Sequence, residues 1–522
     1  MIFQKCWDKR KIVKLFFWIF LLLGIFARVW RFGVIPADIN QDEAFAGYEA
    51  YSLLHYGMDS SGHHFPVYLT AWGSGMNALN TYLIIPFMAV FGLKEWVIRL
   101  PQLIVSCLTL WVVYLIVKRV VDEKTALAAL LLTAICPWHI YMSRWGLESN
   151  LAPGFVLFGL YFFIRGLEEK RYLMLSALMY GLSLYTYATI WPVIPLVILG
   201  QLIYCMYYKK IVFSKEFVFS GVILGALALP LLLFLFVNYG FINEISTPFF
   251  SIPKLVRMRS SEISFSDFWD NAKNLCAVII KQTNSGFGEF TVTKRYGLFT
   301  YYTLPFFFLG IFYYLKKIVE KWKKKEFGLE VLIWIQFMAG ILIGLVINVN
   351  ITRVNILFLP MLIITATGIC WICGFVHRYA VLALLPLYLL QFGLFEHYYF
   401  TDFEEEVHAY FDYGIGDAVC NAMEHEGTIY VSGKVKFPKI LFYSREPVTD
   451  YLETVEYKNY PATFLKVRSF GRFRFGIPEE VVDLDGIYIL DDSQNSDQFT
   501  ALGFTLEQYG NFTMAYLKDE SQ

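Results

Sequence analysis

Charged side chains are scarce in this sequence. Only 17% of its 522 residues are charged, whereas 57% are hydrophobic and 19% are aromatic. A soluble globule must keep much of its surface polar, so this composition excludes a soluble protein of this size. The first apolar run also lacks a small-residue cleavage site, and Arg28, Trp30 and Arg31 follow it. We therefore expect a retained membrane anchor rather than a removed signal peptide.

Long apolar runs, in contrast, are abundant. A helix needs about 20 mostly apolar residues to span a membrane, because its rise must cover a hydrocarbon core of about 30 Å. About eleven segments meet this requirement and predict a polytopic α-helical membrane protein. These segments lie near residues 12–30, 99–117, 125–141, 151–165, 172–189, 191–208, 217–237, 300–315, 330–348, 354–374 and 380–397.

The zero net charge hides an asymmetry along the chain. Residues 401–522 carry 22 acidic and 10 basic side chains, a net charge of −12, and the preceding part carries the balancing +12. Much of that positive charge lies in short loops that alternate with the others, which predicts that these loops are cytoplasmic. Eleven crossings of the cell membrane from a cytoplasmic N-terminus then place the acidic C-terminal part outside.

The predicted organisation has two parts. A transmembrane domain covers residues 1–399, with outer loops at 31–98 and 239–299, and a small extracytoplasmic α/β domain covers residues 400–522. In the second part the residue pattern predicts a helix near 411–425 and strands within 427–433, 439–444, 462–467, 486–490 and 504–518. Of the cysteines, only Cys276 and Cys420 are expected outside, and the sequence does not say whether they pair.

The first outer loop contains a helix that starts with two adjacent acids. In residues 40–57, NQDEAFAGYEAYSLLHYG, apolar side chains recur at helical spacing and Gly57 is suited to follow the helix end. Asn40 followed by Glu43 matches a capping box, and acids in a first turn complement the helix dipole. Capping explains one acid better than two, so a second interpretation of Asp42 and Glu43 stays open.

The second interpretation is catalysis outside the membrane. A placed carboxylate such as Asp42 can accept the proton of an acceptor hydroxyl, which contributes about 10²–10⁴-fold to a reaction such as sugar transfer. One carboxylate suffices for an inverting displacement when a lipid-linked phosphate leaves, because cations can stabilise its developing charge. Arginine grips phosphate with two N–H groups. Three arginines at predicted outer ends of spans are candidates, with interfacial snorkelling as their alternative role: Arg99, Arg144 and Arg353.

Further residues are candidates for the same site. Glu148 lies at the mouth of a span, and its alternative role is a salt bridge to Arg144 at helical spacing. The remaining candidates for lining a substrate site are Asn40, Tyr48, Trp72 and Tyr82, although the aromatic ones are equally typical of a membrane-interface belt.

A cluster of histidines in the first loop raises the question of a metal. Its members are His55, Asp59, His63 and His64. Their residue types suit a divalent ion, but the Gly/Ser-rich turn between them leaves the geometry unspecified. We expect no metal and no other cofactor.

These motifs together resemble the GT-C superfamily of membrane glycosyltransferases, and most closely its protein O-mannosyltransferase and aminoarabinose-transferase branch. The resemblance rests on a basic leader, one span and an outer loop with "DE", followed by YGMDSSGHHFP, WGSGMNALNTYLIIPF and FGLKEWVIRLP. It covers about the first 200 residues, and continues to about residue 400 as topology alone. In it Asp42 takes the place of the catalytic aspartate and Glu43 that of the neighbouring glutamate. Arg99 resembles the arginine that serves the donor phosphate, and Glu148 a second-loop acid of some relatives.

The resemblance implies an inverting glycosyltransferase that takes a sugar from a polyprenyl-phosphate carrier on the outer face of the membrane, generally without metal. The acceptor hydroxyl would belong to a glycan, a lipid or a protein. No part of the chain matches the acceptor-specific domains of eukaryotic protein mannosyltransferases, so the acceptor class stays open. No nucleic-acid partner is expected. The alternative is a transporter or flippase of lipid-linked sugars, which would place its ionisable residues at mid-membrane.

Overall fold

The computed structural model describes residues 9–71, 75–211, 213–258, 265–283, 295–375, 380–481 and 483–518. Two compact units interleave along the chain. The first, here called the helical unit, contains residues 1–32, 101–230 and 260–399, and the second, the mixed unit, contains residues 33–100, 231–259 and 400–522. The last change between them coincides with the domain boundary predicted at 399/400, but the mixed unit also takes in parts of both predicted outer loops.

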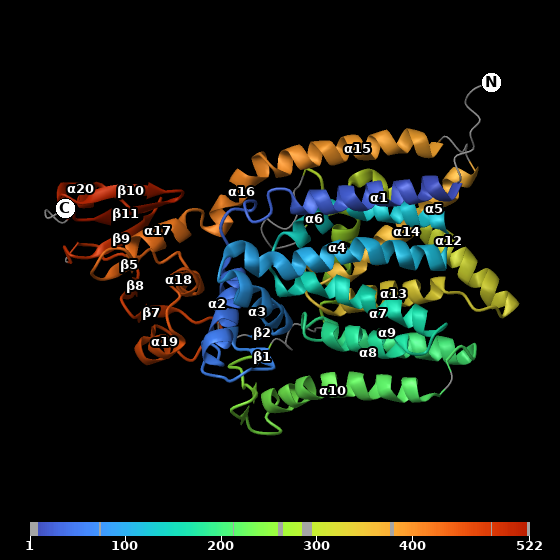
Figure 1. Cartoon of the computed structure of the whole chain (residues 1–522), viewed down its shortest axis with the longest axis horizontal. Coiled ribbons are helices and arrows are strands. Elements are labelled where there is room, and N and C mark those ends of the chain that lie inside the picture. Colours follow the sequence, from blue (N-terminus) through green and yellow to red (C-terminus); the bar gives the residue numbers. More distant parts are fainter. Residues whose placement is uncertain are drawn as a thin grey trace. The chain divides into compact units, whose positions relative to one another are not determined.

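The helical unit is a bundle whose helices overlap the predicted apolar segments, apart from one short helix in the predicted outer loop 239–299 (Figure 1). Two of its helices also contribute residues to the mixed unit, namely α4 (Glu95–Val120) and α10 (Lys215–Asn238). The others are α1 (Lys9–Val29), α5 (Glu123–Ala134), α6 (Pro137–Ser143), α7 (Ala152–Gly166), α8 (Tyr172–Ser183), α9 (Ile190–Tyr207), α11 (Phe268–Cys276), α12 (Leu304–Lys324), α13 (Glu330–Val346), α14 (Phe358–Phe375) and α15 (Ala380–Tyr399).

Five of the described helices are long and apolar enough to cross a membrane. They are α1, α4, α9, α10 and α14 with the short turn before it, and α5 with α6 makes a sixth if this pair, bent by 61°, is one span. The helices α3 (Leu79–Phe91), α8 and α13 are apolar but shorter. All eleven predicted segments are therefore helical, whereas eleven complete crossings stay a prediction.

Close packing in the bundle depends on glycine where α12 meets α14. A Cβ atom on Gly310 would lie 2.0 Å from the carbonyl oxygen of Ile364, and one on Gly368 would lie 2.0 Å from that of Phe306. Two glycines thus let the backbones touch, as small residues do between membrane helices. α14 is largely buried within the bundle, as the helix at its centre should be.

The mixed unit begins with the predicted loop helix. α2 (Gln41–Tyr56) packs against α3 (Leu79–Phe91), and short hairpins join β1 (Tyr68–Leu69) to β2 (Met76–Asn77) and β3 (Ile245–Ser246) to β4 (Ser251–Ile252). The C-terminal helices are α16 (Asp402–Phe411), α17 (Ile415–Ala422), α18 (Phe437–Ser444), α19 (Val448–Thr454) and α20 (Asp497–Ala501).

A seven-stranded mixed sheet forms the core of the C-terminal part, in the order β10-β11-β9-β5-β8-β7-β6 (Figure 1, orange to red). β5 pairs in parallel with both β8 and β9, and the other neighbours are antiparallel. The strands are β5 (Ile429–Val431), β6 (Glu456–Tyr457), β7 (Val467–Phe470), β8 (Phe473–Phe475), β9 (Ile487–Asp491), β10 (Thr505–Tyr509) and β11 (Phe512–Tyr516).

Two strand predictions in this region are wrong. Residues 439–444 belong to helix α18, because Pro438 stands in its first turn, where a missing N–H costs nothing, and its apolar side chains are buried. Of residues 462–467, only Val467 is in a strand, and residues 462–466 form turns and irregular structure. The predicted helix and the strands at 427–433, 486–490 and 504–518 are confirmed with shorter bounds.

Candidate functional site

The start of α2 is held by the predicted capping box. The side-chain oxygen of Asn40 accepts hydrogen bonds from the backbone N–H of Asp42 at 2.9 Å and of Glu43 at 2.8 Å. In return, the Asn40 N–H donates to Glu43 Oε2 at 3.2 Å. This box fixes the backbone of the first turn, and it leaves the side chain of Asp42 partly exposed at the positive end of the helix dipole.

Glu43 has a second task, because it forms a buried ion pair with Arg99. Arg99 donates from Nε to Glu43 Oε1 at 2.8 Å and from Nη2 to Oε2 at 3.0 Å, and both side chains are fully buried. The same guanidinium group donates to the carbonyl oxygens of Pro36 at 2.7 Å and Asp38 at 2.5 Å. Arg99 therefore ties the loop before α2 to its first turn, and its predicted phosphate contact would require these bonds to be exchanged.

Arg144 is also engaged with protein acceptors. Nη1 donates to the carbonyl oxygens of Arg28 and Trp30, both at 2.8 Å, and Nη2 donates to that of Arg31 at 2.9 Å. These carbonyls lie in the last turn of α1 and just after it, where a cation offsets the negative end of the helix dipole. The ring of Tyr399 lies 5.5 Å from the guanidinium carbon. Arg144 thus caps the C-terminal end of α1 by binding its carbonyl oxygens.

The loop after Arg144 is compact and polar. α6 ends at Ser143, so the helical spacing that suggested a salt bridge between Arg144 and Glu148 does not apply. Glu148 is buried at the start of a 3₁₀ turn (Glu148–Leu151). Asn150 donates to the carbonyl oxygen of Trp145 at 3.0 Å, which fixes the loop. Elsewhere in the helical unit, Arg353 is half-buried and donates to the carbonyl oxygen of Asn348 at 2.9 Å.

The aromatic candidates differ in their surroundings. Tyr48 is buried in the apolar core of the mixed unit, and its hydroxyl donates to the carbonyl oxygen of Glu446 at 2.7 Å. Tyr82 is half-buried and donates to the carbonyl oxygen of Pro66 at 3.0 Å. Trp72 lies outside the described residues. Their predicted substrate contacts stay predictions.

Asp38, Tyr443 and Glu95 form a half-buried cluster that the sequence did not indicate. Asp38 adopts a left-handed backbone conformation with φ of 57°, which aspartate tolerates better than most residues. Its Oδ2 accepts from the N–H of Gly414 at 2.7 Å, and its Oδ1 lies 3.3 Å from the Tyr443 hydroxyl, which also donates to Glu95 Oε1 at 2.7 Å. Burial raises the pKa of Asp38 and places that of Tyr443 well above its usual value. A contact between residues about 400 positions apart cannot be predicted from a single sequence.

Two members of the histidine cluster, His63 and Asp59, belong to an ion-pair network with Glu244. His63 Nε2 lies 2.8 Å from Glu244 Oε1, and His63 Nδ1 lies 3.6 Å from Asp59 Oδ1. Burial lowers the pKa of His63, but its carboxylate partners outweigh this effect and raise it. Nearby, burial and then Asp59 raise the pKa of Glu49 to about 8. Among the described residues, no three His, Cys, Asp or Glu side chains could hold a metal ion together.

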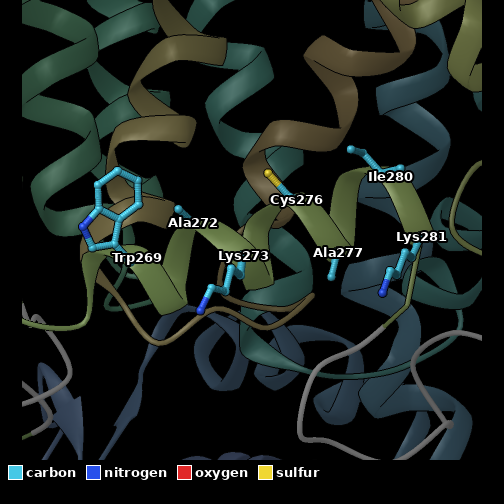
Figure 2. A pocket seen from close by; sticks show the side chains of 7 residues that line it. All are labelled: Trp269, Ala272, Lys273, Cys276, Ala277, Ile280 and Lys281. Atoms are coloured by element: carbon cyan, nitrogen blue, oxygen red, sulfur yellow. The ribbon is translucent and has the colours of Figure 1, made fainter.

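A surface hollow of about 410 Å³ runs along α11 and the π-helical turn Ala277–Lys281 (Figure 2). Trp269 and Ile280 contribute apolar surface, and Lys273 and Lys281 are among its lining residues. Such a pairing of exposed aromatic and basic side chains is typical of a helix at a membrane interface. The hollow contains none of the residues predicted for the site.

The chain is similar to known proteins in part of its sequence and in its fold. Residues 78–236 match the family model described as dolichyl-phosphate-mannose-protein mannosyltransferase. The structure of ArnT from Cupriavidus metallidurans bound to undecaprenyl phosphate is similar over 97% of this chain and 98% of that one, with 11% identity and a TM-score of 0.53. Its apo form gives 13% identity, the same coverage and a TM-score of 0.52. The chain has the fold of the GT-C glycosyltransferases.

The GT-C fold also relates the chain to a larger enzyme. The oligosaccharyltransferase of Archaeoglobus fulgidus, tethered with an acceptor peptide, matches with 15% identity and a TM-score of 0.51. The match covers 85% of this chain but only 63% of that one. No curated protein matches by sequence. The fold that the sequence resemblance implies is confirmed by the match to ArnT.

The family model covers only some of the predicted site residues. The matched residues 78–236 include Arg99, Arg144 and Glu148, but the match begins after Asp42 and Glu43. The roles predicted for individual residues therefore depend on their geometry.

Proposed function

We propose that this protein is an inverting glycosyltransferase that moves a sugar from a polyprenyl-phosphate donor to a hydroxyl acceptor on the outer face of the cell membrane. The acceptor is a glycan, a lipid or a protein. Three findings support this proposal: the GT-C fold, the mannosyltransferase family model, and the similarity to an ArnT structure that binds undecaprenyl phosphate.

The observation that carries the proposed chemistry is the start of α2. The capping box holds the backbone of Asp42, Arg99 engages the neighbouring Glu43, and the Asp42 carboxylate stays partly exposed. Of the two adjacent acids, Asp42 is thus the one suited to meet a substrate. Glu43 acts as a positioning residue in this scheme, because both of its oxygens already bind Arg99.

In the proposed reaction, Asp42 accepts the proton of the acceptor hydroxyl as its oxygen attacks the anomeric carbon. The bond from that carbon to the phosphate oxygen breaks, and the lipid phosphate leaves with the electron pair as an anion. One displacement inverts the anomeric centre and needs no covalent intermediate. Cationic side chains stabilise the departing phosphate, and the predicted candidates for this role are Arg99, Arg144 and Arg353.

The decisive test uses the purified full-length chain with a panel of labelled polyprenyl-phosphate sugars and an Asp42→Asn variant. Loss of the base should lower the rate of transfer by about 10²–10⁴-fold. Asp270→Asn changes an exposed acid in α11 and is the matched control, which should keep the parent rate. Transfer by Asp42→Asn at the parent rate would refute the assignment, and translocation of the lipid without a new glycosidic bond would indicate a transporter instead.

We also propose eleven crossings with the N-terminus in the cytoplasm and the C-terminal part outside. Cys276 and Cys420 are both exposed and free, so they are natural reporters of this orientation. A membrane-impermeant maleimide added to intact cells should label both. Labelling of either one only after the cells are broken would contradict the orientation.

A further inference from the structure

The C-terminal part of the mixed unit packs directly on the helix that starts with Asp42. α18 lies against α2 (Figure 1), and a Cβ atom on Gly47 would lie 2.7 Å from the ring of Phe442. The hydroxyl of Tyr48 donates to the carbonyl oxygen of Glu446 just beyond α18. The apolar core of the C-terminal sheet includes Tyr48 itself. α2 is thus as much a part of this core as of the first loop.

The polar cluster around Asp38 extends this contact to the loop before α2. Both carboxylate oxygens of Asp38 meet C-terminal groups, namely the N–H of Gly414 at 2.7 Å and the hydroxyl of Tyr443 at 3.3 Å. Tyr443, on α18, has one hydroxyl proton, and its shorter bond of 2.7 Å goes to Glu95 at the start of α4. Tyr443 therefore bridges the loop before α2 and the first turn of α4.

A continuous set of bonds leads from Asp38 to Asp42. The carbonyl oxygen of Asp38 accepts from Arg99, which grips both oxygens of Glu43. Glu43 and Asn40 cap each other, and the Asn40 side chain holds the N–H of Asp42. Arg99 thus fixes this loop through its backbone, and the C-terminal part fixes it through the Asp38 side chain. Buried networks of this kind rigidify what they connect when every member is satisfied.

We propose that the C-terminal part is a built-in positioning element of the active site, and that Tyr443 and Asp38 set the position of Asp42 by clamping residues 36–40. The proposal rests on the proposed function for its consequence in catalysis, but the clamp itself is a statement about structure. It assigns the C-terminal part a role in the chemical step, through the placement of the base, in addition to any contact with the acceptor.

The first test removes one hydroxyl with Tyr443→Phe. Displacement of a catalytic group by about 1 Å can cost about 100-fold, so we expect kcat to fall by about 10- to 100-fold. The KM for the polyprenyl-phosphate sugar should stay near the parent value, because the clamp does not bind donor. Tyr430→Phe is the matched control, since Tyr430 donates to Asp483 within the C-terminal sheet region, and it should keep the parent kcat.

The second test separates the charge of Asp38 from its backbone conformation. Asp38→Asn keeps a side chain that tolerates positive φ and still accepts from the Gly414 N–H, so it should retain more activity than Asp38→Ala. Combining Asp38→Asn with Tyr443→Phe should cost less than the product of the two single effects, because the two side chains are in contact.

Hydrogen exchange tests the clamp independently of catalysis. Tyr443→Phe should raise the exchange of backbone amides in residues 36–44 relative to the parent, while Tyr430→Phe should not. Parent kcat together with parent exchange in Tyr443→Phe would overturn the proposal, and so would a fall in kcat with unchanged exchange. If Asp42→Asn keeps the parent rate, the proposed base is wrong, yet the exchange result still decides whether the clamp exists.

Discussion

Helix α2 buries one glutamate in its first turn and another in its middle. The two sites differ in how they compensate for the burial of a carboxylate. Glu43, in the first turn, has the guanidinium group of Arg99 on both oxygens. Glu49, in the middle, instead accepts bonds from the N–H (2.8 Å) and the hydroxyl of Ser60, with Asp59 as a like charge nearby. A buried carboxylate needs either a cation or a proton.

This difference separates a site next to the proposed base from one that stabilises a loop. The ion pair at Glu43 connects α4, the loop before α2 and the helix start that presents Asp42. The pKa of Glu49 is about 8, so this group is mostly protonated at neutral pH and closes the turn around Ser60. The cation at Glu43 therefore marks the half of α2 that is relevant to the proposed reaction.

Breaking the Glu43 site should have the largest effect on stability. Arg99→Met leaves a buried carboxylate without its cation, which costs about 3–5 kcal/mol when a buried pair loses one member. We expect this loss in the free energy of unfolding, measured in detergent micelles. The double variant Glu43→Met/Arg99→Met removes both charges and should recover part of it. A loss below about 1 kcal/mol for Arg99→Met would show that the pair does not organise this region.

The Glu49 site should make the free energy of unfolding depend on pH. The pKa of Glu49 is raised from 4.5 to about 8 in the folded protein, so between these values the folded state holds a proton that the unfolded state has released. Its contribution to stability is therefore complete below about pH 4.5, decreases as the pH rises and is lost above about pH 8. A full shift of this kind corresponds to a few kcal/mol.

The measurement is the free energy of unfolding of the parent and of Glu49→Gln between pH 5 and 9. Glutamine keeps the shape of the side chain but does not titrate, so the slope from this site should vanish. Glu453→Gln, an exposed change on α19, is the control that should keep the parent slope. An unchanged slope in Glu49→Gln would contradict a protonated Glu49.

The contrast along α2 also shows what the sequence could predict. The capping box of Asn40 and Glu43 and the helix end at Gly57 depend on residues a few positions apart, and both are present in the structure. Apolar runs likewise predicted the helices of the bundle, because a membrane-spanning helix must satisfy its own backbone. These features are local and require no knowledge of the fold.

The partners of these residues could not be predicted, because they depend on contacts distant in sequence. Arg99 and Glu43 are separated by 56 positions, and Tyr443 and Asp38 by 405. α18 was expected as a strand, because residues 439–444 carry no clear helical pattern. Their packing against α2, which the sequence does not show, accompanies the helix. The sequence thus identified Asp42 and Arg99 as residues of interest, but it could not predict that Arg99 binds both oxygens of Glu43.

Arg144 sharpens the comparison, because it is a buried arginine that binds backbone carbonyls. Its guanidinium group donates to three carbonyl oxygens at the end of α1 and just after it, at 2.8, 2.8 and 2.9 Å. Arg144→Met should cost about 1–3 kcal/mol, because it removes the donor of three carbonyl oxygens. Arg144→Lys keeps the charge but loses the fork and should fall between Arg144→Met and the parent. If Arg144→Met lowers the free energy of unfolding as much as Arg99→Met does, then it makes no difference whether the arginine binds carbonyl oxygens or a carboxylate.

The smallest expected effect concerns the cap that holds Asp42 itself. Asn40→Ala removes the oxygen that binds the N–H groups of Asp42 and Glu43, and such a change costs about 1 kcal/mol. Asn40→Asp keeps a capping oxygen but adds a negative charge beside Asp42, so it should keep the stability and still change the pH dependence of transfer. Asn40→Ser keeps the oxygen without the charge and should keep both. If Asn40→Ala lowers stability by about 1 kcal/mol and leaves kcat unchanged, then Arg99 and the clamp at Asp38 suffice to position Asp42, and the cap serves the helix alone.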